Sequence, residues 1–181
     1  MCKTYEINDK DFKKIEAFVE QRAIDNELYH KRGGFKELDL WVGAFAEYAS
    51  YYYLKDQGLD VTKPDLTIYK AKDKSFDADL TDGVKKFHVK GQSMESKRRY
   101  GDSWLLQRWD KIVQKKIQNH YLILCNVDVE NRKVEILGTP SVSSIHNAEC
   151  WSECKYYLFQ KTKVALYLPE MKKKISNLWR V

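Results

Sequence analysis

Proline and cysteine are scarce in this chain of 181 residues, which holds three prolines and four cysteines. With so few prolines and no repeat or low-complexity tract, a linker between domains is not indicated, and we expect a single domain over residues 1–181. The cysteine spacing does not suit the disulfide framework of a secreted protein. No apolar run reaches the roughly 18 residues of a membrane span, and the first residues do not resemble a signal peptide. We therefore expect a cytoplasmic protein outside any membrane.

Charge of one sign is only slightly in excess. Lysine and arginine number 32 against 26 aspartates and glutamates, a net charge of +6. A basic excess suits a polyanionic partner, because cationic side chains neutralise phosphates. Aromatic residues make up 13% of the chain, and such rings fill cores or stack on bases. Composition alone therefore permits nucleic-acid binding without establishing it.

Two helices are predicted in the first third of the chain. Asn8 or Asp9 can cap a helix that runs over residues 9–27. A second helix is expected over residues 37–57 and is ended by Gly58. Apolar and aromatic residues fill a broad arc of this second helix, which predicts that it is largely buried.

The remaining patterns predict a sheet and further helices. Strands are expected over residues 66–68, 75–80, 84–91, 121–127, 133–137 and 163–168. Thr81-Asp82-Gly83 is a turn signal, and Pro169 begins a short basic helix. Residues 102–119 carry apolar side chains at helical spacing, which predicts a helix with Trp109 facing inward. This order predicts an α/β (α+β) fold, a mixed central β-sheet flanked by helices.

Two of these predicted strands carry polar side chains in matching phase. Asp77 and Asp79 share one face of the first strand, and His88 and Lys90 share one face of the next. A tight hairpin would bring the two polar faces together. Carboxylates bind Mg²⁺, and a bound metal lowers the pKa of its water. A lysine can position that water or hold a phosphate, so the pattern predicts phosphodiester hydrolysis.

This pattern resembles the core of the PD-(D/E)xK, or restriction-endonuclease-like, nucleases. In that family one strand carries an acidic residue, and the next carries an acidic residue, any residue and lysine. Asp79 matches the first acid, because an apolar residue usually follows it in the family and Leu80 does so here. Asp77 is the alternative match.

The second strand and the preceding helix extend the resemblance over residues 37–92. The sequence HVK at residues 88–90 matches the tripeptide, and GQS follows as in many members, where a glutamine (here Gln92) supports the site. GAFAEY resembles the family's helix that supplies a glutamate, here Glu47. The resemblance implies a Mg²⁺-dependent deoxyribonuclease with a restriction-endonuclease-like core. Its implied metal ligands are Asp79, Asp77, Glu47 and His88, and its implied catalytic residues are Asp79, Lys90, Glu47, His88 and Gln92.

His88 departs from the family, which usually has Asp or Glu at this position. A neutral imidazole binds metals but brings no negative charge and is softer than a carboxylate. We prefer the interpretation that Asp77 or Glu47 supplies the missing charge, so that the enzyme is active and Mn²⁺ can replace Mg²⁺. The alternatives are a catalytically weakened nucleic-acid-binding protein with the same fold, and a structural domain in which the charges only form ion pairs.

Basic residues beyond the tripeptide are candidate phosphate contacts. They are Lys97, Arg98, Arg99 and Arg108. Family members that cut both strands of a duplex usually act as homodimers, so the resemblance implies DNA as the partner and a homodimer. The target, and RNA in place of DNA, are left open.

A second candidate site has helical spacing. His146, Cys150 and Cys154 stand at i, i+4 and i+8, which could align three zinc ligands. Structural zinc sites more often use paired Cys-x2-Cys knuckles, and no fourth ligand lies near in sequence. We therefore interpret the two cysteines as buried thiols.

Overall fold

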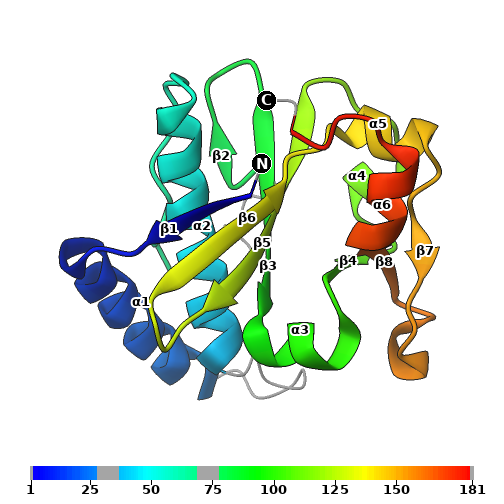
Figure 1. The fold of residues 1–181 in the computed structure, drawn as a ribbon. Helices are drawn as coiled ribbons and strands as arrows, with labels where there is room; N and C mark the ends of the chain where they lie inside the picture. The colour runs from blue at the N-terminus through cyan, green and yellow to red at the C-terminus, as the bar shows by residue number, and fades with distance from the viewer. Residues whose placement is uncertain (1, 28–36, 69–77, 180–181) are drawn as a thin grey trace.

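The computed structural model describes residues 2–27, 37–68 and 78–179. Figure 1 shows the elements in chain order. They are β1 (Lys3–Glu6), α1 (Asp9–Glu27), α2 (Glu37–Asp56), β2 (Leu80–Thr81), β3 (Lys86–Ser93), α3 (Met94–Tyr100), β4 (Ser103–Gln107), α4 (Lys111–Gln114), β5 (His120–Asp128), β6 (Lys133–Gly138), α5 (Val142–Asn147), β7 (Ser152–Glu153), the 3₁₀ turn η1 (Tyr157–Phe159), β8 (Lys163–Tyr167) and α6 (Leu168–Lys174).

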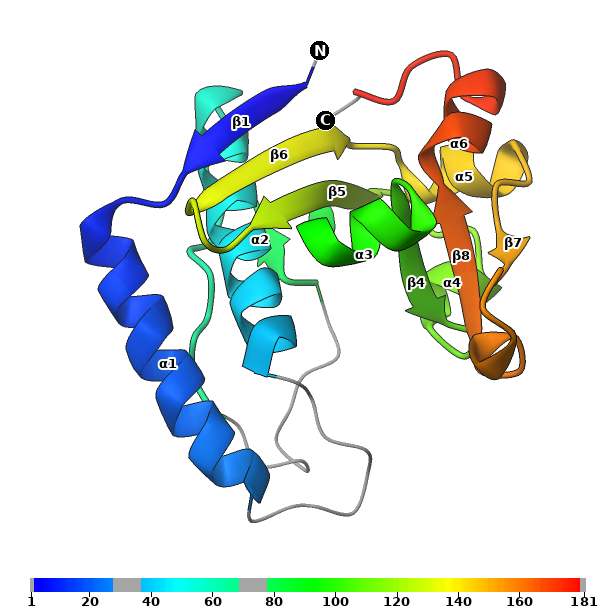
Figure 2. The same cartoon turned by 60° about the horizontal axis from the view of Figure 1, so that its bottom comes forward.

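These strands form two sheets. The larger is mixed, in the order β1-β6-β5-β3-β2, with β3 and β5 parallel and the other neighbours antiparallel. The smaller is antiparallel, in the order β4-β8-β7. Helices α1 and α2 lie on one side of the large sheet, and the small sheet lies on the other side with α5 and α6 (Figures 1 and 2). The expected α/β class, a mixed sheet flanked by helices, is confirmed.

The two N-terminal helices form as their sequence predicts. Asn8 caps α1, because its Oδ1 accepts a hydrogen bond from the Asp11 backbone N–H at 2.9 Å. Gly58, with φ of 79°, follows the end of α2, and the Leu59 N–H then donates to the Leu54 carbonyl at 3.1 Å. Helix α2 is largely buried, with Phe45 fully enclosed.

Apolar side chains of the large sheet point alternately into two cores. Phe87 and Val89 of β3 pack with Ile123 of β5 against α1 and α2. Leu122 and Leu124 of β5 pack on the opposite face, toward the small sheet, α5 and α6. Since side chains alternate along a strand, the even-numbered residues of β3 face away from α2.

The predicted helix over residues 102–119 is wrong. Most of its first part is β4, and only a short helix, α4, follows. Trp104 and Leu106 are 2% and 3% exposed while Leu105 is 38% exposed, which is the alternation of a strand. Trp109, expected to face inward, is 62% exposed. Pairing of β4 with β8 outweighs the helical spacing.

Several smaller differences separate the sequence from the structure. Residues 66–68, predicted as a strand, have no regular secondary structure, and residues 75–77 of another predicted strand lie outside the described residues. The turn is confirmed, with Gly83 at φ of 90° and Asp82 Oδ1 accepting from the backbone N–H groups of Val84 and Lys85 at 2.9 and 2.6 Å. Within the described residues, no helix has the length and apolar character needed to cross a membrane.

Candidate functional site

Asp79 lies where the chain enters the β2–β3 hairpin. Its backbone N–H donates to the Phe87 carbonyl at 3.0 Å, and its Oδ2 accepts from the Val89 backbone N–H at 2.7 Å. The side chain therefore continues the ladder that starts at the Leu80–Phe87 pair. This hydrogen bond fixes the carboxylate beside Val89, the residue that separates the two polar residues of the tripeptide.

Lys90 occupies the middle of the large sheet. It pairs in register with Leu124 of the parallel strand β5. Its side chain is partly buried, and alternation directs it, like His88, away from α2. Among the described residues no carboxylate lies within ion-pair distance of its ammonium group. A partly buried cation in this state is suited to an anionic ligand.

His88 is 9% exposed and forms a pair with His120 of β5. The Nε2 atom of His88 lies 2.9 Å from Nδ1 of His120, and the rings stack with centroids 5.1 Å apart and planes at 22°. One ring nitrogen donates and the other accepts. The sequence alone does not predict that His120 lies beside His88, because only the parallel pairing of β3 and β5 brings the two residues together.

Gln92 shares the face of Lys90 but makes its hydrogen bonds elsewhere. Its Nε2 donates to the Gly101 carbonyl at 2.9 Å and to Ser103 Oγ at 3.3 Å. Its Oε1 accepts from the Ser103 backbone N–H at 3.1 Å. The buried amide thus links β3 to the start of β4 across α3.

Glu47 lies partly buried on α2, next to a close contact with β3. A Cβ at Gly91 would lie 2.9 Å from Val42 Cγ1 and 3.1 Å from Ala46 Cβ. Helix α2 therefore runs directly against the strand that carries the tripeptide. Because Lys90 projects from the other face, the structure does not bring Glu47 and Lys90 together on one face.

Asp77 lies outside the described residues, so the structure describes only Asp79, Glu47 and His88 of the four predicted metal ligands. Within the described part of the chain, no cluster of three or more His, Cys, Asp or Glu is arranged to hold a metal. Mg²⁺ is usually held by one or two carboxylates while it keeps several waters. The oxygen donors of Asp79 fit that chemistry, whereas Glu47 lies on the α2 side of β3, away from Lys90.

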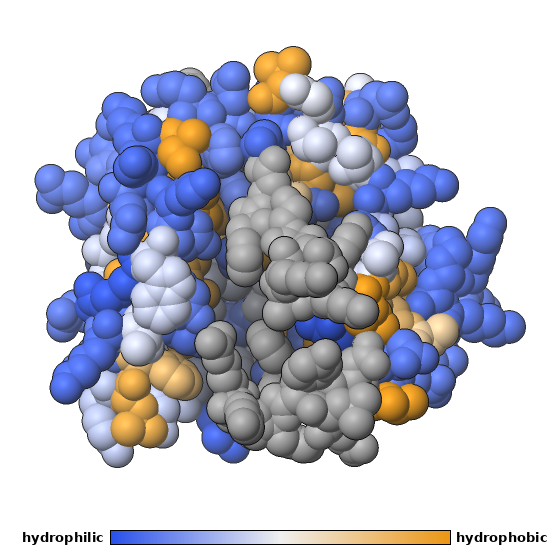
Figure 3. Space-filling view, turned by 180° about the vertical axis from the view of Figure 1, so that it is seen from behind, coloured by the Kyte–Doolittle hydropathy of each residue, from blue (hydrophilic) through white to orange (hydrophobic). Residues whose placement is uncertain are grey.

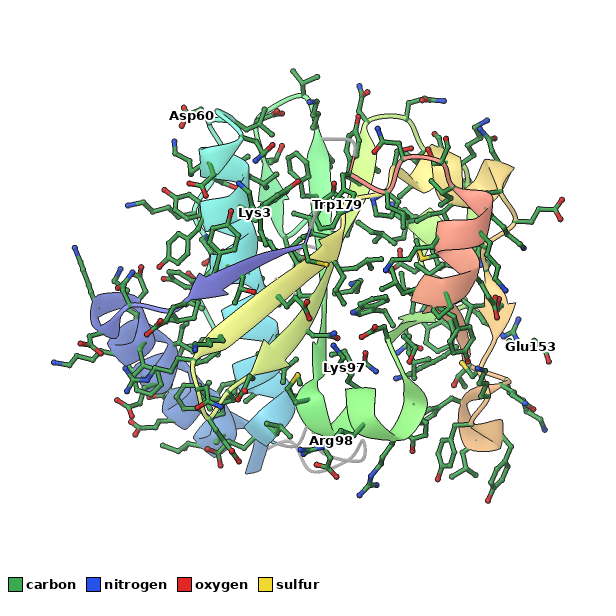
Figure 4. All side chains as sticks on the ribbon, in the orientation of Figure 1. Lys3, Asp60, Lys97, Arg98, Glu153 and Trp179 are labelled. Carbon is green, nitrogen blue, oxygen red and sulfur yellow. The ribbon has the colours of Figure 1, made fainter. Side chains whose placement is uncertain are left out.

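Two of the predicted phosphate contacts lie on opposite sides of α3 (Figure 4). Lys97, on the inner side, forms ion pairs with Asp102 at 3.3 Å and Glu135 at 3.4 Å. Arg98, on the outer side, forms no ion pair with another described residue and is exposed. Arg98 is therefore better placed than Lys97 to meet a phosphate.

The other two predicted contacts are already paired. Arg99 bonds Glu95 one turn earlier on α3 at 2.8 Å. Arg108 lies 3.7 Å from Glu153, and its Nε donates to the Gln160 carbonyl at 2.9 Å. A phosphate would have to displace these carboxylates.

The interpretation of Cys150 and Cys154 as buried thiols is confirmed. Each is 1% exposed, and burial raises the pKa of both. Helix α5 ends at Asn147, so His146 and the cysteines do not share one helix. The His146 Nε2 donates to the Ile112 carbonyl at 2.9 Å.

A pocket of about 530 Å³ opens at the carboxyl end of β3. Gln92 and Ser93 line it, whereas Asp79, His88 and Lys90 do not. The pocket therefore adjoins the predicted catalytic residues without containing them.

No match was found among models of protein families, curated proteins or solved structures. The assignment of a function therefore rests on the geometry of these residues.

Proposed function

We propose that this chain is a metal-dependent endonuclease that hydrolyses phosphodiester bonds of DNA, similar to the PD-(D/E)xK nucleases. The observation that carries the proposal is the hydrogen bond between Asp79 and the Val89 backbone. It holds a carboxylate beside the residue between His88 and Lys90. Asp79 directly precedes β2, and Lys90 lies on β3 after a tight hairpin; this is similar to the family's arrangement of an acid on one strand and a lysine on the next.

The carboxylates would hold the metal ion. Asp79 and Asp77, with His88, are the groups that would bind Mg²⁺ or Mn²⁺ beside Lys90, and the metal would supply a Lewis acid and a water of lowered pKa. Glu47, which the resemblance also implies as a ligand, lies on the α2 side of β3, away from His88 and Lys90. The Val89 N–H restrains Asp79 before substrate arrives, so less orientation remains to be fixed during the reaction.

Lys90 supplies the cation. Its ammonium is partly buried and forms no ion pair with a described residue. It can therefore donate to a phosphate oxygen or orient the attacking water.

The second candidate is a nucleic-acid-binding protein of the same fold that has lost hydrolysis. The bond between His88 and His120 favours it. That bond occupies one of the two ring nitrogens of His88, at the position where the family has a carboxylate. A site built in this way has less negative charge with which to attract a divalent cation.

Incubation with supercoiled plasmid, a four-way junction and single-stranded DNA, with Mg²⁺, with Mn²⁺ and with chelator, separates these candidates. The endonuclease is expected to cut at least one substrate with metal and none with chelator. Binding of DNA without cleavage of any substrate in either metal would establish the second candidate instead. Failure to bind DNA at low salt would contradict both.

A further inference from the structure

The pocket at the carboxyl end of β3 has walls from distant parts of the chain. They come from the first turns of α2, the end of β3, α3, β4, and the segment from Cys154 to β8. Its lining includes Tyr100, Lys155, Tyr156, Phe159, Lys163 and Tyr167. We name it the Tyr156 pocket.

Aromatic rings at the mouth of the Tyr156 pocket are exposed. Tyr100, Tyr156 and Phe159 are 46%, 39% and 36% exposed. Tyr156 joins the others, with ring centroids 6.3 Å from Tyr100 and 5.3 Å from Phe159. In Figure 1 η1 lies at the lower right. Figure 3 shows the molecule from behind, so the same region is at the lower left, where apolar side chains are exposed. Exposed apolar groups gathered around a recess indicate a binding site.

The same pocket carries positive charge. The Lys155 Nζ lies 4.5 Å from the Tyr167 ring centroid, and the Lys163 Nζ lies 4.7 Å from that of Phe159. Asp39 is the carboxylate in the lining, so the two ammonium groups outnumber it. Ammonium groups set against aromatic rings suit a ligand that has both flat apolar faces and negative charge.

We propose that the Tyr156 pocket binds unpaired nucleotides of a single-stranded nucleic acid. Bases pack on the exposed faces of Tyr100, Tyr156 and Phe159, while the two lysines meet the phosphates. A regular duplex does not suit the recess, because its base faces are already stacked on one another. A protein partner would use the rings but has no general need for the lysines.

The pocket has a direct relation to the catalytic residues of the proposed function. Gln92 and Ser93 line it and follow Lys90 on the same strand. A strand held there would lead its backbone toward Lys90. Binding in the pocket requires no hydrolysis, whereas this link to cleavage rests on the proposed function.

Fluorescence anisotropy with a labelled oligothymidylate, an oligouridylate and a blunt duplex, in chelator and at low salt, tests the pocket. We expect tighter binding of the single strands than of the duplex, and the two single strands show whether DNA or RNA is preferred. Tyr156→Ala should weaken single-strand binding on the order of tenfold, the loss of one stacked base. Trp109→Ala is the matched control, because Trp109 is 62% exposed but does not line the pocket. Lys163→Gln tests the contribution of charge, and Lys161→Gln is its control, because Lys163 lines the pocket and Lys161 does not.

Equal affinity for duplex and single strand would overturn the inference, as would equal losses of affinity from Tyr156→Ala and Trp109→Ala. Equal losses would show that the oligonucleotide does not bind specifically in the Tyr156 pocket. The outcome is separate from that of the nuclease, because no metal is present. Plasmid cleavage without single-strand preference retains the nuclease alone, and single-strand binding without cleavage retains the pocket alone.

Discussion

The imidazole rings of His88 and His120 share a hydrogen bond between Nε2 of the first and Nδ1 of the second, 2.9 Å apart. This bond couples the tautomers of the two side chains. If His88 donates from Nε2, then Nδ1 of His120 is the acceptor, and a neutral His120 carries its proton on its own Nε2. If His120 donates from Nδ1, a neutral His88 carries its proton on Nδ1. Both rings must then be the same tautomer.

We therefore predict that nitrogen NMR of the imidazole rings at about pH 8, above the ordinary histidine pKa of about 6.5, finds matching tautomers. His146→Gln and His30→Gln assign the signals. The Nε2–H form leaves a lone pair on His88 Nδ1 for a metal, and the Nδ1–H form does not. Opposite tautomers would contradict the hydrogen bond.

Asp79→Asn and Lys90→Met are predicted to abolish most cleavage while the fold survives. Asparagine retains an oxygen for the Val89 N–H but loses the charge, and methionine keeps the length of the lysine stem. Each should lower the cleavage rate by about 100-fold or more. Asp60→Asn is the control, because Asp60 is exposed beyond the end of α2 and pairs with Lys55 (Figure 4). Rates are measured by plasmid nicking and folding by circular dichroism; wild-type rates in both variants would remove the site.

Gly91→Ala and Gly43→Ala should change stability in opposite directions. A Cβ at Gly91 would meet the Val42 carbonyl oxygen at 3.0 Å as well as two side chains. The contact with backbone predicts destabilisation by about 1–3 kcal/mol. Gly43 lies within α2 with nothing within 4 Å of a Cβ, so alanine should stabilise the helix by roughly 0.5–1 kcal/mol. Urea unfolding measures both, and a stabilised Gly91→Ala would contradict the close packing of α2 on β3.

Burial raises the pKa of Cys125 from 9.0 to about 12. Between these values the unfolded thiol ionises while the folded one keeps its proton, so the stability present below pH 9 is lost as pH rises toward 12. Cys125→Ala should flatten this part of the curve of unfolding free energy against pH.

At neutral pH we expect a thiol reagent to modify the exposed Cys2 quickly and the buried Cys125 slowly. Rapid reaction of Cys125 would show that the sheet opens there.

The sequence predicts an element correctly where the pattern of one short segment determines its secondary structure. The broad apolar arc of α2 and the continuous apolar run of β5 predict both elements, and the turn signal at residues 81–83 predicts that Asp79 lies near β3. The prediction from sequence is wrong or missing where pairing with a distant segment determines the structure. Leu106 fits both the helical spacing predicted for residues 102–119 and the strand alternation of β4, and the partner strand β8 lies about 60 residues away. The position of His120 likewise depends on strand order, which local pattern does not encode.

Strands β3 and β5 are neighbours in the large sheet, yet the chain leaves between them to build α3, β4 and α4. Asp79 and Lys90, the residues of the proposed chemistry, therefore lie beside or within the large sheet. Part of the wall of the Tyr156 pocket instead comes from residues 94–119, the segment between β3 and β5. Changes in residues 94–119 could alter which ligand is held without disturbing Asp79 or Lys90. On the two proposals, this connectivity would place ligand selectivity and reactivity largely in different segments, linked by the Gln92 amide that bonds Gly101 and Ser103. Chimaeras that exchange only residues 94–119 would test that separation.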